Sequence, residues 1–106
     1  MNTEILLNEL KSEVGELAKG MLSKYKDEAT ADGHAFLDTI KDDLEKWVEM
    51  LVAGKISKDE FDSLVRGQKD LAEMKALKQL GLAKVQCDKF VNAIIDKTIV
   101  KCLGLI

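Results

Sequence analysis

Apolar residues recur along the chain at spacings of three and four, the period of one face of an α-helix. The first stripe predicts a helix over about residues 4–28, and it consists of Leu6, Leu10, Val14, Leu17, Met21 and Tyr25. Gly15 and Gly20 lie inside this stretch, where each costs about 1 kcal/mol relative to alanine. Close approach of a partner helix would explain both glycines.

A second helical pattern covers about residues 34–52. Its outer face is acidic, and its apolar face consists of Phe36, Leu37, Ile40, Leu44, Trp47, Val48 and Leu51. Residues 29–33 interrupt the pattern between the two helices. Thr30 or Asp32 can cap the second helix by accepting hydrogen bonds from its free N–H groups. The two helices are therefore predicted to form an antiparallel hairpin.

The clearest local signal follows the second helix. Gly54 suits the left-handed residue that ends a helix, and Ser57 with Glu60 forms a capping box. Ile56 and Phe61 stand at the two positions of a hydrophobic staple. A helix is therefore expected to begin directly after Ser57, where the chain has turned back sharply.

Residues 51–71, about a fifth of the chain, resemble the short helical-hairpin module called SHOCT. The shared pattern has, in this order, an apolar residue, a glycine, an isoleucine, a serine or threonine, an acidic residue, a glutamate and a phenylalanine. Generic helix-start chemistry selects the same residue types. The resemblance implies an oligomerisation or adaptor role rather than catalysis.

The third helical region can continue without interruption over about residues 58–103, on the order of 65 Å if straight. Leu80, Gly81 and Leu82 form a candidate stop, with Gly81 at the left-handed position. No good N-cap follows them, so a continuous helix or a kink at Gly81 is favoured. Residues 1–106 are then a single all-α, bundle-like domain in which this long helix packs across the hairpin.

The last part of the chain, residues 90–106, is its most apolar stretch. The apolar positions after Phe90 cover an arc of roughly 220°, about twice what a surface helix of a bundle needs. This surplus predicts association with a second copy or with another protein. The candidate interface residues are Val91, Ile94, Ile95, Ile99, Cys102 and Leu105.

Composition is consistent with a soluble amphipathic helical protein: 46% of the residues are apolar, 33% are charged and none is proline. The net charge of −3 divides unevenly along the chain. Residues 1–53 hold six Lys and twelve Asp or Glu, whereas residues 54–106 hold ten Lys or Arg and seven Asp or Glu. The two halves are therefore expected to pack against each other.

The N-terminus lacks the basic segment and apolar stretch of a secretory signal. No uncharged apolar run approaches the roughly 18 residues that span a bilayer. Together with only two cysteines, these features favour a reducing, cytoplasmic setting.

No group of residues indicates catalysis, a cofactor or a bound metal. His34 is the only histidine, and its ladder with Asp38 and Asp42 lacks the second histidine of a di-iron site. Cys87 and Cys102 have no zinc spacing and are expected to be buried hydrophobes. A solvated face is expected for the acidic stripe of Asp38, Asp42, Glu45 and Glu49.

The sequence therefore predicts a non-enzymatic helical interaction or assembly protein. It would self-associate or bind a protein partner through its apolar C-terminal helix, without a cofactor or small-molecule substrate. A peripheral membrane role is the first alternative, because Lys97 and Lys101 flank the apolar face. The second alternative is a nucleic-acid-associated regulator that uses the lysines of residues 54–106.

Overall fold

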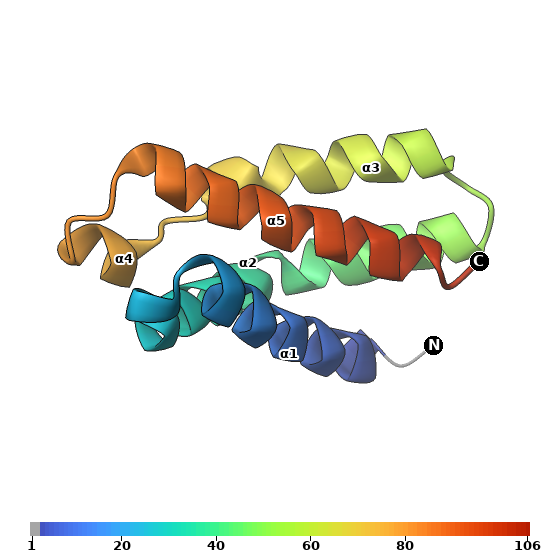
Figure 1. Cartoon of the computed structure of the whole chain (residues 1–106). Helices are drawn as coiled ribbons and strands as arrows, with labels where there is room; N and C mark the ends of the chain where they lie inside the picture. The colour runs from blue at the N-terminus through green and yellow to red at the C-terminus, as the bar shows by residue number, and fades with distance from the viewer. Residues whose placement is uncertain (1–2) are drawn as a thin grey trace.

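The computed structural model describes residues 3–106 as packed helices without a strand in that range (Figure 1). The elements are α1 Thr3–Met21, a 3-10 turn Ser23–Tyr25, α2 Lys26–Val52, α3 Lys58–Arg66, a 3-10 turn Gly67–Leu71, α4 Lys75–Gln79 and α5 Lys84–Leu103. The predicted all-α, bundle-like class is confirmed.

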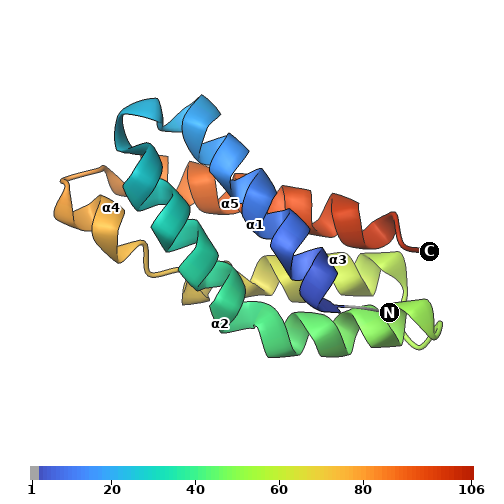
Figure 2. The same ribbon diagram turned by 90° about the horizontal axis from the view of Figure 1, so that it is seen from below.

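The four longer helices run alternately in opposite directions, so that neighbours in the chain are antiparallel (Figure 1, Figure 2). α1 and α3 each pack against both α2 and α5. The short helix α4 closes the end of the bundle that lies away from the start of α1 and the end of α5. The predicted antiparallel hairpin is therefore present as α1 and α2.

The boundary between these two helices differs from the prediction. A single helix over residues 4–28 and an interruption at residues 29–33 are both wrong, because α1 ends at Met21 and α2 already begins at Lys26. The turn forms around Leu22, which buries its side chain in the core while its carbonyl accepts a hydrogen bond from the Tyr25 N–H at 2.8 Å.

Gly33, which contributed to the predicted interruption, lies inside α2 and serves close packing of the helices. It is buried, and a Cβ atom there would overlap the Val14 Cγ1 and lie 3.2 Å from the Ile94 Cδ1. The glycine therefore allows α1 and α5 to approach α2 closely. Thr30 and Asp32 lie inside α2 and do not cap it, and Asp32 instead accepts hydrogen bonds from α4.

The turn between α2 and α3 follows the sequence signal closely. Gly54 has the left-handed conformation, with φ of +73°. The Ser57 hydroxyl accepts a hydrogen bond from the Glu60 N–H at 3.1 Å, and the Ser57 N–H donates to the Glu60 carboxylate at 3.0 Å. Phe61 is fully buried. The predicted helix start at Lys58 is confirmed.

The continuous or kinked helix predicted over residues 58–103 is wrong, because the chain breaks both before and after α4. At the second break Gly81 has φ of +84°, and the Leu82 N–H donates to the Leu77 carbonyl at 3.1 Å. This is the helix stop that the sequence offered as an alternative. Folding back places α5 against α3, which buries apolar faces that a straight helix would leave in water.

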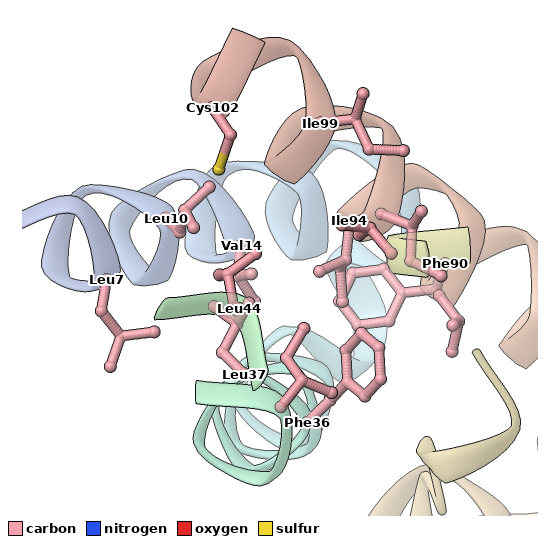
Figure 3. Packing of buried hydrophobic residues seen from close by; sticks show 14 of the residues in the cluster. Leu7, Leu10, Val14, Phe36, Leu37, Leu44, Phe90, Ile94, Ile99 and Cys102 are labelled. Carbon is pink, nitrogen blue, oxygen red and sulfur yellow. The ribbon is translucent and has the colours of Figure 1, made fainter. Parts of the chain in front are cut away.

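A single apolar cluster fills the bundle, and Figure 3 shows part of it. Phe36 of α2 and Phe90 and Ile94 of α5 point toward one another, and Cys102 points from α5 toward Leu10 on α1. α5 packs against α1, α2, α3 and α4. Coverage from several sides is the physical reason for its wide apolar arc.

Candidate functional site

Most of the residues predicted to form an interface are buried inside the chain. Leu105 is the exception, with 44% of its surface exposed. At most 5% of the surface is exposed for Val91, Ile94, Ile95, Ile99 and Cys102. These five contact their own fold because α5 is covered by its neighbours, so the open apolar surface of the molecule lies elsewhere.

His34 and the acidic ladder on α2 join α2 to α1. The Nε2 atom of His34 lies 2.9 Å from the Lys11 carbonyl oxygen, and the Asp38 carboxylate lies 2.8 Å from the Lys11 Nζ. Asp42 is exposed. Within residues 3–106, no group of three or more His, Cys, Asp or Glu side chains is placed to hold a metal ion.

Both cysteines are buried and have free thiols. Burial raises the pKa of the Cys102 thiol to about 12 and also raises the pKa of the Cys87 thiol. A raised pKa reduces the fraction of thiolate, which is the nucleophilic form. In the folded chain these thiols are therefore packing groups.

Apolar residues are exposed along the line where α1 and α5 run side by side in opposite directions, which we call the α1–α5 seam (Figure 1, Figure 2). A hollow of about 440 Å³ lies where α1 begins and α5 ends. Its lining consists of Ile5, Leu6, Glu9, Val100, Lys101, Gly104 and Leu105. Val100 is 70% exposed, so its side chain is available to a partner.

A second hollow of about 350 Å³ continues along the same seam toward the end of α1. Its lining consists of Glu13, Glu16, Leu17, Gly20, Met21 and Lys97. Met21 is 43% exposed. In the described part of the chain, a Cβ atom at Gly20 would meet nothing beyond its own helix within 4 Å. Gly20 therefore leaves room for a backbone to approach from outside.

Lys101 lines the first hollow and joins α5 to α1. Its Nζ lies 3.3 Å from the Glu9 carboxylate and 3.5 Å from the Glu13 carboxylate. The hydrogen bond from Lys101 to Glu9 is the main cause that raises the pKa of this lysine. Lys101 is thus charged and already paired with two carboxylates, so it is not available to bind an anionic group of a partner.

The other carboxylate oxygen of Glu13 has no such partner. Glu13 Oε2 is buried and makes no hydrogen bond within residues 3–106. A buried acceptor without a donor costs free energy. Glu13 lines the second hollow, but this oxygen is shielded from the space inside it.

Comparisons with models of protein families, with curated proteins and with solved structures found no match to this chain. In the described residues, no helix is long and apolar enough to cross a membrane.

The sequence predicted Leu105 as an interface residue and assigned Leu6, Leu17 and Met21, which also line the hollows, to the core-facing stripe of the first helix. The available signal for the seam was a second stripe on α1 in which successive residues are four positions apart. It begins one position before the core stripe and shares Leu17 and Met21 with it. This stripe consists of Ile5, Glu9, Glu13, Leu17 and Met21, all of which line one of the two hollows. Because it mixes apolar and acidic residues, a search for apolar periodicity alone does not detect it.

Proposed function

We propose that this chain is a non-enzymatic interaction protein that binds an amphipathic helix of another protein along the α1–α5 seam. The observation that carries the proposal is the pair of hollows in that seam, with Met21, Val100 and Leu105 exposed beside them. Exposed apolar residues that gather along a groove are typical of protein-binding surfaces. A groove between two helices suits a third helix.

The length of the seam fits such a partner. From Ile5 to Met21, α1 rises about 24 Å, which corresponds to roughly four turns of a partner helix. A helix of that length presents apolar residues at positions i, i+3 or i+4, and i+7 to one groove. The two hollows would each receive part of that apolar stripe.

The charge of the seam favours a partner that carries Lys or Arg. The linings contain three carboxylates, from Glu9, Glu13 and Glu16, and two ammonium groups, from Lys97 and Lys101. This excess of one acidic group favours a cationic partner. The same excess disfavours phosphate-rich partners such as nucleic acids and anionic membranes.

Two synthetic helices of about 18 residues test the proposal. Both carry Leu at i, i+3 or i+4, and i+7, and their flanking charged positions are Lys in one probe and Glu in the other. Fluorescence anisotropy with labelled probes gives the dissociation constant of each. The basic probe is expected to bind at least about tenfold more tightly, because it alone can pair with the acidic wall of the seam.

Substitution within α5 locates the binding surface. Val100→Asp is expected to weaken binding of the basic probe at least about tenfold, because a carboxylate would be buried against apolar groups. Val85→Asp is the matched control, since Val85 is 63% exposed on the same helix but outside both hollows. It should leave the dissociation constant unchanged.

Other results would contradict the proposal. Equal binding of the two probes, or equal effects of the two aspartate variants, would show that the seam does not select a basic helix. Light scattering after size exclusion would assign the seam to a second copy if the wild type is a dimer that only Val100→Asp dissociates. Flotation with anionic liposomes that only Val100→Asp abolishes would assign it to a lipid surface.

A further inference from the structure

Residues 72–83 form a separate small unit at one end of the bundle, which we call the α4 strap. The strap consists of α4 and the non-helical residues on both sides of it. It lies beside the first half of α2, away from the start of α1 and the end of α5 (Figure 1, Figure 2). The strap therefore covers an end of the core that none of the longer helices covers.

The side-chain hydrogen bonds that hold the strap to the bundle are few and specific. Oδ1 of Asp32 accepts a hydrogen bond from the Ala76 N–H at 3.1 Å, and Oδ2 accepts one from the Leu77 N–H at 2.8 Å. Within residues 3–106, Asp32 is the only side chain outside the strap that hydrogen-bonds to it. The carboxylate thus joins α2 directly to the first turn of α4.

Backbone hydrogen bonds join the strap to the rest of the chain only at its two edges. The helical bonds of α4 and the stop at Gly81 are internal to residues 72–83. At the edges, the Ala72 N–H donates to the Lys69 carbonyl, and the Ala83 carbonyl accepts from the first turn of α5. Opening of residues 72–82, with Ala83 kept as the N-cap of α5, would therefore break no hydrogen-bond ladder of the other helices.

Strain and burial act in opposite directions on the strap. Met74 has φ of +51°, a conformation that L-residues with side chains rarely adopt and that costs free energy. Its side chain and that of Leu77 are buried in the core, with 3% and 0% of their surface exposed. These two buried side chains, the partly buried Ala72 and Leu82 and one carboxylate therefore offset the strain and the ordering of the whole segment.

Cys87 lies in the first turn of α5, directly after the strap, where its N–H donates to the Ala83 carbonyl at 3.1 Å, whereas Cys102 lies at the other end of the same helix. The Cys87 side chain is 2% exposed, and this burial is the main reason that the pKa of its thiol is raised, while the charge of Lys78 on α4 lowers the pKa in part. Cys102 faces Leu10 on α1 and is fully buried (Figure 3). The two thiols thus report on separate regions of one helix.

We propose that the α4 strap opens as a unit while α1, α2, α3 and α5 remain folded, and that Asp32 is the latch that keeps it closed. Regions held by few apolar contacts open locally at a lower free energy than the whole domain. Opening uncovers Cys87 and leaves Cys102 buried. This device is independent of the α1–α5 seam, which lies between other elements.

Labelling of the two thiols under native conditions tests the proposal. The folded full chain is treated with N-ethylmaleimide, and peptide mass spectrometry gives a separate rate for each cysteine. In the wild type, Cys87 is expected to react at least about tenfold faster than Cys102, because Cys102 becomes accessible only when the bundle unfolds. Equal rates would overturn the proposal, since both thiols would then depend on global unfolding.

A variant without the latch sharpens the test. Asp32→Ala removes both hydrogen bonds and improves the helix propensity of α2. It is expected to accelerate labelling of Cys87 at least about tenfold, as hydrogen bonds to a charged group contribute this much, with a much smaller change at Cys102. Asp42→Ala is the matched control, because Asp42 is exposed on the same helix. Asp32→Asn, which keeps one acceptor, should lie between.

The wild type alone decides the question if Asp32→Ala does not fold. Labelling is repeated at increasing urea concentrations below the unfolding transition. A local opening exposes less surface than global unfolding, so the rate at Cys87 should rise less steeply with urea than the rate at Cys102. Identical slopes, or equal acceleration of both thiols by Asp32→Ala, would show that the strap does not open separately.

Discussion

Residues 29–33 of α2 and residues 54–60 of the α2–α3 turn contain the same kinds of residue but act over different distances. Each segment has a glycine and a side chain that can cap a helix. In the turn, Ser57 and Glu60 exchange hydrogen bonds three residues apart. In α2, Asp32 caps a helix 44 residues further along the chain.

The two glycines differ in the same way. Gly54 is exposed and supplies the positive φ that reverses the chain. Gly33 lies in a regular helix and supplies space, because a Cβ atom would overlap Val14. A glycine with a neighbouring cap residue is thus an ambiguous signal, which the position of distant helices resolves.

Gly33→Ala should have the largest effect of the substitutions that separate these two segments. We expect the free energy of unfolding to fall by about 2 kcal/mol, because overpacking costs up to about 3 kcal/mol and alanine recovers roughly 1 kcal/mol of helix propensity. Urea unfolding monitored by circular dichroism measures the change. On a Val14→Ala background the loss should disappear, because the overlapping methyl group is gone. Unchanged or increased stability of the single variant would show that Gly33 is not required for packing.

Ser57→Ala should have a smaller effect, since it removes one reciprocal cap at the surface. The expected loss is about 1 kcal/mol in the free energy of unfolding, measured in the same way. Glu60→Ala should cost less on that background than in the wild type, because the two side chains act as a pair. Ser63→Ala, at an exposed serine inside α3, is the control and should not destabilise. Equal losses at both serines would contradict a role for the capping box.

Gly15→Ala should have the smallest effect and the opposite sign. A Cβ atom at Gly15 would meet nothing beyond its own helix within 4 Å in the described chain. Alanine should therefore raise the melting temperature through a gain of up to about 1 kcal/mol in helix propensity. Calorimetry of Gly15→Ala and Gly33→Ala compares the same substitution at a site with room for the added methyl group and at a site without it. A loss at Gly15 would mean that α1 needs this glycine for a contact outside the chain.

The parts of the fold that the sequence predicted are those decided within one or two helical turns. The end of α2, the capping box and the helix start at Lys58 all depend on residues close in the chain. The break before α4 depends on Asp32 and on burial of Met74, so no local pattern announces it. Likewise, the wide apolar arc of α5 does not show which other helices cover it.

The candidate seam was less predictable than the fold. Leu105 was predicted from the same apolar arc as the five buried residues, and it is exposed because it lies beyond the end of α5. Val100 and Met21 belong to the seam only because α1 and α5 lie side by side. A surface formed by two helices at opposite ends of the sequence requires knowledge of their packing before its residues can be grouped.

The burial of Cys102 against α1 also has a consequence for synthesis on the ribosome. Translation adds about 5–20 residues per second, and α5 begins only at Lys84. The first two helices are therefore complete for seconds before the helix that covers their apolar faces exists. During that interval the part of Leu10 that Cys102 later covers faces solvent or a chaperone, and the finished bundle forms only after α5 has left the exit tunnel.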